Sequence, residues 1–128
     1  MAKQVRARPT DIGALVEDRA LKLLNQAGLE LLSRNFRCRF GEIDLIMRDE
    51  ATIVFVEVRH RASARFGSAA ETISPAKQRR LRLTAQWFLV RGGYGEHDIS
   101  RFDVVTSDGP VDSFPSLHWQ QAALWFDD

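Results

Sequence analysis

Hydrophobic positions near the start of the chain recur at helical spacing. They fall three or four residues apart, which places them on one face of an α-helix. Thr10 or Asp11 can cap the start of this helix, and Gly28 is a natural residue to follow its end. The predicted buried face consists of Ile12, Leu15, Val16, Ala20, Leu23, Leu24 and Ala27.

Three segments with strand-like patterns follow this helix, over residues 29–35, 38–47 and 52–59. The third contains the apolar run 53–56, which is typical of a central strand covered on both faces. Residues 50–51 can form the tip of a hairpin between the second and third segments. The pattern therefore predicts a sheet that begins directly after the first helix.

A second helix is predicted after a polar, basic loop at residues 60–73. Ser74 can cap this helix, and Pro75 suits its first position. The helix should run to about Val90 and end at the two glycines that follow, with its inward face formed by Leu81, Ala85, Phe88 and Leu89.

The last third of the chain returns to shorter elements. Residues 98–106 are predicted to form a strand, 111–117 an edge strand and 119–126 a short helix. Helices that alternate with strands favour an α/β fold, in which helices flank a central sheet. We expect a basic arm at residues 1–10 and one domain over 11–128.

Composition fits a globular protein of one domain. The chain has 128 residues, of which 45% are hydrophobic, and this length can bury a sizeable core. Cys38 is the only cysteine, which excludes an intrachain disulfide and a zinc knuckle. No apolar run approaches the ~20 residues of a membrane span, and the basic start lacks the apolar stretch of a secretory signal. We therefore expect a cytoplasmic protein without a membrane partner.

Charge is distributed unevenly along the chain. Residues 1–94 hold 17 Lys and Arg against 10 Asp and Glu, whereas residues 95–128 hold 1 against 7. Arginine makes up 15 of the 18 basic residues, and its planar guanidinium suits phosphate oxygens. This favours a nucleic-acid partner, although a genome rich in G and C would also enrich arginine.

The candidate chemistry lies in two neighbouring strands. Glu42 and Asp44 share one face of the first, and Glu57 and Arg59 share one face of the second. The expected hairpin register pairs Asp44 with Glu57 and Glu42 with Arg59. Like charges opposed in this way destabilise a sheet, and a hard divalent cation such as Mg²⁺ would offset the repulsion. The pattern therefore indicates a metal site.

Glu17 can complete this site from the first helix, because it lies at the border of the apolar face. Each residue also has a simpler interpretation. An isolated Glu-x-Arg on a strand is usually a surface ion pair, as Glu42 and Arg59 could be, and a Glu at a helix border is usually solvated. The coincidence of acids on three successive elements favours the metal site.

These motifs resemble the PD-(D/E)XK nuclease superfamily and, more closely, the YraN family of uncharacterised bacterial endonuclease-like proteins, related in fold to Holliday junction resolvases. The resemblance covers about residues 11–106. The matching stretches are Gly13-x-x-x-Glu17-x-x-Ala20, Gly41-Glu42-Ile43-Asp44-Leu45-Ile46, Val54-Phe55-Val56-Glu57-Val58-Arg59-x-Arg61, Ser74-Pro75-x-Lys77 with Arg80-Leu81, and Arg101-Phe102-Asp103-Val104-Val105.

The resemblance implies a restriction-endonuclease-like core with a mixed sheet, and a catalytic site of Glu17, Asp44, Glu57 and Arg59. The three acids would hold Mg²⁺ or Mn²⁺. Arg59 stands where the superfamily has lysine, and a permanently charged arginine is a poor general base. Further residues are predicted in lesser roles: Arg61, Arg65, Lys77 and Arg80 as nucleic-acid contacts, and Glu42 and Asp103 as supporting acids.

Three functions remain open on the sequence. The first is a metal-dependent endonuclease acting on DNA, including branched or flapped DNA, and a homodimer would suit cleavage of two symmetric strands. The second is a nucleic-acid-binding module of the same fold with little activity. The third is a protein-interaction module that uses the acidic, aromatic tail. Trp87 and Trp119 are predicted core residues rather than stacking platforms for bases.

Overall fold

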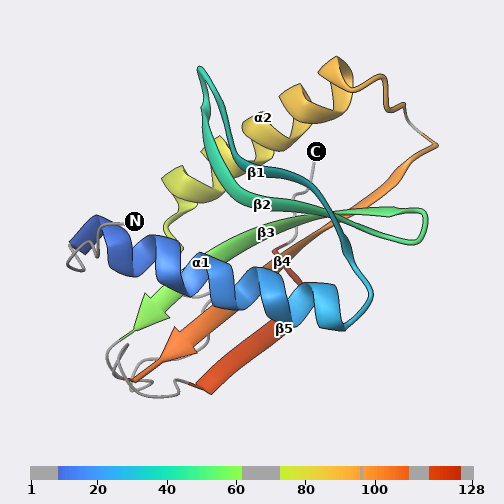
Figure 1. Cartoon of the computed structure of the whole chain (residues 1–128). Coiled ribbons are helices and arrows are strands. Elements are labelled where there is room, and N and C mark those ends of the chain that lie inside the picture. Colours follow the sequence, from blue (N-terminus) through green and yellow to red (C-terminus); the bar gives the residue numbers. More distant parts are fainter. Residues whose placement is uncertain (1–8, 62–72, 96, 110–115, 125–128) are drawn as a thin grey trace, which may run out of the picture.

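In the part of the chain that the structure describes, a five-stranded sheet lies between two helices (Figure 1). The computed structural model describes residues 9–61, 73–95, 97–109 and 116–124. Within these ranges the strands lie in sequence order across the sheet, and only β3 and β4 pair in parallel. The elements are α1 (Pro9–Gln26), β1 (Glu30–Cys38), β2 (Gly41–Asp49), β3 (Thr52–Arg61), α2 (Pro75–Arg91), β4 (Ile99–Asp108) and β5 (Ser116–Leu124).

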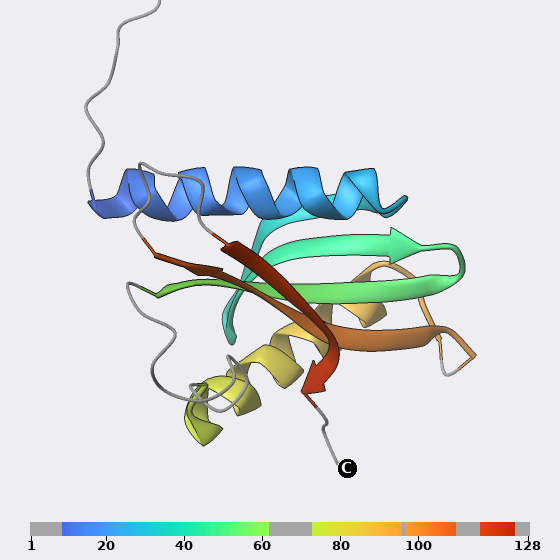
Figure 2. The same cartoon turned by 90° about the horizontal axis from the view of Figure 1, so that it is seen from below.

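The two helices cover opposite faces of this sheet, so the fold is a three-layered, mixed α/β arrangement (Figure 2). A parallel pair needs a crossover connection, and α2 supplies it between β3 and β4. Within the described ranges, neither helix has the length and apolar character needed to cross a bilayer.

Helix α1 buries a narrower stripe than its pattern predicts. Val16, Ala20 and Leu24 are buried, whereas Leu15 is 38% exposed and Ala27 is exposed. A straight helix lying on a sheet touches it along one line of residues about four apart, so the margins of the apolar face stay in solvent. The helix begins at Pro9, before Thr10 and Asp11, so the prediction that one of these two residues caps its start is wrong.

The first two strands differ from their predicted boundaries. Cys38 ends β1 and pairs with Gly41, the first residue of β2, across a turn formed by Arg39 and Phe40. The sequence suggested one strand beginning at Cys38 because this turn contains no Asn-Gly or Asp-Gly signal. Gly41 has φ +154°, and a Cβ there would lie 3.3 Å from Thr84 Oγ1 on α2. Glycine thus lets the hairpin approach the helix.

The hairpin between β2 and β3 is confirmed. Asp49 pairs with Thr52, so Glu50 and Ala51 form the tip, and Glu50 adopts the left-handed conformation at φ 55°. The register continues to Leu45 with Val56. It is the register expected from the sequence as far as this pair.

The predicted start and end of α2 are also confirmed. Ser74 Oγ accepts a hydrogen bond from the backbone N–H of Lys77, Pro75 occupies the first turn, and Gly92 caps the end. Leu81 and Ala85 are buried, and Phe88 and Leu89 are partly buried against the same core. Residues 62–72 of the predicted loop lie outside the described residues, and its first two residues extend β3.

The predicted edge strand is confirmed at residues 116–117, whereas the helix predicted after it is wrong over the described residues 119–124. Residues 116–124 form the edge strand β5, so there is no helix over 119–124, and 111–115 lie outside the described residues. Leu117 and Trp119 pack against the core beneath α1, while His118 and Gln120 are exposed. This alternation is the mark of a strand. An irregularity at Ala122, which has φ 50°, interrupts the alternation of buried and exposed residues. The strand pattern was therefore not recognisable in the sequence over this segment.

Candidate active site

The candidate site lies where β2 and β3 part. Their ladder ends at Leu45 with Val56. Beyond that pair, β2 continues to Gly41 alongside β1, whereas β3 continues to Arg61 alongside β4. Figure 1 shows the β1–β2 hairpin bending away from β3 toward α2. The next residues after the last pair are Asp44 and Glu57, so both acids occupy the fork.

The two carboxyl groups meet in this fork. The side chains of Asp44 and Glu57 line the same cleft at this fork, and Asp44 Oδ2 accepts a hydrogen bond from the backbone N–H of Val58 at 2.8 Å. Burial, together with the negative charge of Glu57, raises the pKa of Asp44 to about 8. A proton or another cation is therefore needed to hold the pair together near neutral pH.

Lys77 supplies one positive charge to the pair. Its Nζ lies 2.5 Å from Glu57 Oε2, and only 3% of the Glu57 side chain is exposed. The Ser74 cap and Pro75 fix the first turn of α2, which carries Lys77 over the sheet. The sequence placed Lys77 among nucleic-acid contacts, whereas the structure brings it directly to a buried acid.

A cleft of about 190 Å³ opens over the two acids. Its walls come from the start of β2 and the first half of α2. The lining residues are Gly41, Glu42, Asp44, Glu57, Lys77, Arg80 and Leu81. All five polar side chains in this list were singled out in the sequence, so the cleft brings together residues from three separate motifs.

Glu17 approaches the site from the α1 side of the sheet and is held there by two residues of β1. Arg34 Nε donates to Glu17 Oε1 at 3.3 Å. With its amide nitrogen turned toward the acids, Asn35 donates to Glu17 Oε1 and to Glu42 Oε1, each at 3.1 Å. The charge of Glu17 contributes to the raised pKa of Asp44, although it is the smallest of the causes.

Asn35 and Arg34 were not identified from the sequence. Asn35 has φ 56°, a left-handed conformation that asparagine tolerates better than most residues. An asparagine inside an otherwise regular strand pattern was the only available signal for this bend.

The predicted pairing of Glu42 with Arg59 is wrong. Glu42 instead lies opposite Arg37 on β1, and Arg37 Nε donates to Glu42 Oε2 at 3.2 Å. The cause is the fork, because β2 has already left β3 at this point. Arg59 is half-buried on β3, and among the described residues it has no hydrogen bond or ion pair.

Of the other predicted phosphate contacts, Arg80 joins Lys77 in the cleft and Arg61 lies in an ion pair. Arg61 Nε pairs with Asp108 Oδ1 at 2.8 Å at the end of β3. Arg80 is exposed and lines the cleft. Arg65 lies outside the described residues.

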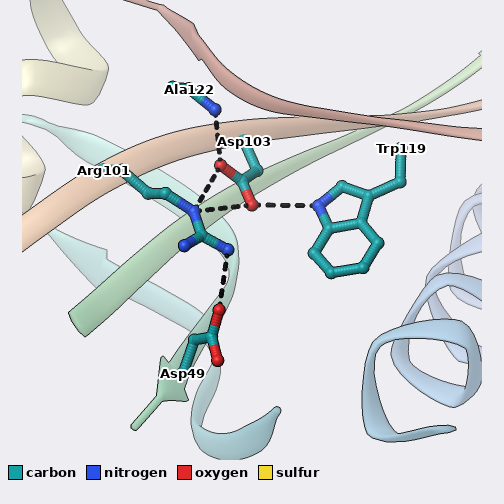
Figure 3. Close-up of polar contacts among 5 residues, drawn as sticks. All are labelled: Asp49, Arg101, Asp103, Trp119 and Ala122. Carbon is teal, nitrogen blue, oxygen red and sulfur yellow. Dashed lines mark hydrogen bonds and ion pairs between the residues drawn. The ribbon is translucent and has the colours of Figure 1, made fainter. Parts of the chain in front are cut away.

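Asp103 serves the fold rather than the cleft. Its carboxylate is fully buried and accepts from Arg101 Nε at 3.1 Å, Trp119 Nε1 at 2.9 Å and the Ala122 backbone N–H at 2.9 Å (Figure 3). Arg101 also reaches Asp49 at the hairpin tip, at 3.2 Å. Asp103 therefore joins β4, the irregular part of β5 and the β2–β3 turn.

The donors in the cleft suit a hard cation held by few protein ligands. In the part of the chain that the structure describes, no three His, Cys, Asp or Glu side chains form a cluster that could hold a metal ion. The pair of Asp44 and Glu57 remains. Mg²⁺ commonly binds through one or two carboxylates and takes its other ligands from water and phosphate, so this pair fits such an ion.

Comparison with known proteins places the chain in a family. A model of the uncharacterised protein family UPF0102 matches residues 16–106. A UPF0102 protein of Pseudomonas putida is 44% identical over 118 residues, which cover 92% of this chain and 96% of the relative. Another, from Alkalilimnicola ehrlichii, is 56% identical over 93 residues, or 73% of this chain and 74% of the relative. The chain belongs to the uncharacterised protein family UPF0102.

Proposed function

We propose that this protein is a divalent-metal-dependent nuclease that hydrolyses DNA phosphodiester bonds, with Asp44 and Glu57 holding Mg²⁺ or Mn²⁺. The observation that carries the proposal is the placement of these two carboxyl groups in one cleft at the fork of the sheet. Such an arrangement is costly in a sheet unless a positive charge offsets it.

The order of elements supports the same interpretation. An acid on β2, a second on β3 and a helix that crosses to a parallel strand β4 match the arrangement expected of a restriction-endonuclease-like core. Glu17 on the preceding helix belongs to no three-acid cluster among the described residues, and its charge acts on Asp44 only as the smallest of the causes that raise the pKa of that group. Its bonds to Arg34 and Asn35 would fix its position.

The side chains in the cleft would have different roles in catalysis. A divalent cation bound there would stabilise negative charge on the phosphodiester and activate water. Asp44 and Glu57 would offer oxygen ligands, and Lys77 would balance the charge of Glu57 while lying beside the substrate phosphate. Arg80, on the cleft wall, would contact neighbouring phosphate oxygens. Arg59 would add positive charge further along β3.

A cleavage assay tests the proposal. Labelled single-stranded, duplex, flapped and four-way-junction DNA would be incubated with the protein in Mg²⁺, Mn²⁺ or EDTA. Asp44→Asn is the test variant, and Glu30→Gln, an exposed acid on β1, is the matched control. Metal-dependent cleavage by the wild type and the control, but not by Asp44→Asn, is expected. Folded wild-type protein that cuts none of these substrates would contradict the proposal.

The alternative is a nucleic-acid-binding module with little activity. It is favoured by Arg59, which stands at the position of the superfamily's lysine and stays protonated. This alternative predicts salt-dependent DNA binding that needs no metal and survives Asp44→Asn, with no cleavage of any DNA in the panel.

A further inference from the structure

One face of α2 joins the acid pair to an exposed aromatic cluster. Lys77, Arg80, Thr84, Trp87 and Arg91 are spaced three or four residues apart, so they form a single stripe along the helix. Lys77 contacts Glu57, and Arg80 and Thr84 lie beside Gly41. The stripe therefore begins in the cleft and follows the β1–β2 turn away from it.

The far end of this stripe carries aromatic rings. Phe40 at the tip of the β1–β2 turn lies edge-on to Trp87, with ring centroids 6.1 Å apart. Each ring makes a cation–π contact with an arginine: Arg39 Cζ is 4.8 Å from the Phe40 centroid, and Arg91 Cζ is 5.6 Å from the Trp87 centroid. We call Arg39, Phe40, Trp87 and Arg91 the aromatic–arginine cluster.

The cluster is accessible, contrary to the prediction that Trp87 is a core residue. Trp87 is 37% exposed and Val90 is 76% exposed. A hollow of about 240 Å³ lies here, lined by Phe40, Leu83, Gln86, Trp87 and Val90. An exposed patch of large apolar side chains usually marks a binding surface.

The positive charge around the patch favours an anionic partner. Helix α2 has five basic residues (Lys77, Arg79, Arg80, Arg82 and Arg91) and no acidic residue among its 17 positions. Arginine beside exposed aromatic rings is the combination that binds unpaired nucleic acid, because bases stack on the rings while the cations contact the backbone. A duplex keeps its base faces stacked and cannot use the rings in this way.

We propose that the aromatic–arginine cluster and the stripe on α2 bind an unpaired nucleic-acid strand that leads out of the carboxylate cleft. The inference rests on the proposed function and adds a preference for substrates with a single-stranded segment. From Lys77 to Trp87 the helix rises ~15 Å, which corresponds to about four stacked nucleotides at the 3.4 Å spacing of one strand.

Binding in EDTA tests this without requiring cleavage. Fluorescence anisotropy would be measured with a labelled 12-nucleotide oligo-dT and with a hairpin duplex of mixed sequence. Trp87→Ala should weaken oligo-dT binding by about fivefold or more. Trp87→Phe, which keeps an aromatic ring, should retain most of the wild-type affinity. Arg91→Ala should lower the slope of log affinity against log salt by about 0.7. Duplex binding should change little.

Two controls separate this proposal from simpler effects. Ile99→Ala removes another exposed apolar side chain, and Arg48→Ala removes an exposed arginine at the other end of β2; both should bind like the wild type. The assay contains EDTA and measures binding alone, so a missing nuclease activity would leave this result intact. The proposal is overturned if Trp87→Ala binds oligo-dT like the controls. It is equally overturned if sedimentation shows that Trp87→Ala converts a wild-type dimer to monomer, because a second copy would then cover the patch.

Discussion

Replacing Asp44 with asparagine should stabilise the fold while it removes the proposed metal ligand. The substitution keeps the shape of the side chain. Its oxygen can still accept from Val58 N–H, and its amide can donate to Glu57. What disappears is the negative charge that the fork buries beside a second acid.

The size of the effect follows from the pKa of Asp44, which the fold raises from 3.8 to about 8. Between these values the folded protein keeps a proton that the unfolded chain releases, so stability falls as pH rises through this window. A difference of about four pH units corresponds to at most ~6 kcal/mol. Relaxation of the fork around the two acids reduces this, and we expect Asp44→Asn to gain about 2–3 kcal/mol at pH 8.5, and far less at pH 4.5.

Urea unfolding followed by circular dichroism at both pH values measures this gain, with Glu30→Gln as the control for loss of an exposed charge. Mg²⁺ should stabilise the wild type and leave Asp44→Asn unchanged, because only the wild type would hold the ion. The reasoning is refuted if Asp44→Asn is no more stable than the wild type at pH 8.5, or if its gain is the same at both pH values.

Other substitutions separate the roles of neighbouring residues. Lys77→Met should lower the single-turnover cleavage rate by about 100-fold while Mn²⁺ still binds; an unchanged rate would remove Lys77 from the site. Arg101→Ala leaves the buried Asp103 without its cation and should cost about 3 kcal/mol in urea unfolding, yet the protein that remains folded should cut DNA at the wild-type rate. Asn35→Ala must adopt the left-handed conformation and should be ~1 kcal/mol less stable than Asn35→Gly; equal stabilities would show that backbone strain is not the cause.

The sequence was informative where local chemistry decided the structure. Ser74, Pro75 and Gly92 placed the ends of α2, because capping depends on a few adjacent residues. The run at 53–56 identified a buried central strand. The turn at Arg39–Phe40 and the continuation of β5 beyond Leu117 were not predicted, because their conformations depend on packing against α2 and on the hydrogen bonds of Asp103.

The acid pair was predictable because the hairpin between β2 and β3 was predictable. The register of this hairpin places Asp44 and Glu57 next to each other. The fork was not predictable, because it arises where β2 follows β1 instead of β3. That divergence sends Glu42 to Arg37 and opens the cleft to Lys77. Contacts of this kind join residues far apart in the chain, and no local pattern records them.

The most direct test of the central claim is a calorimetric titration of the wild type, Asp44→Asn and Glu30→Gln with Mn²⁺ at pH 7 and pH 8.5. The account predicts a saturable site in the wild type and in Glu30→Gln. Binding should be tighter at pH 8.5, because Asp44 must lose its proton to bind the ion, and it should be absent from Asp44→Asn. Equal Mn²⁺ binding by all three proteins, or no binding by the wild type, would contradict the assignment of Asp44 and Glu57 as a metal site.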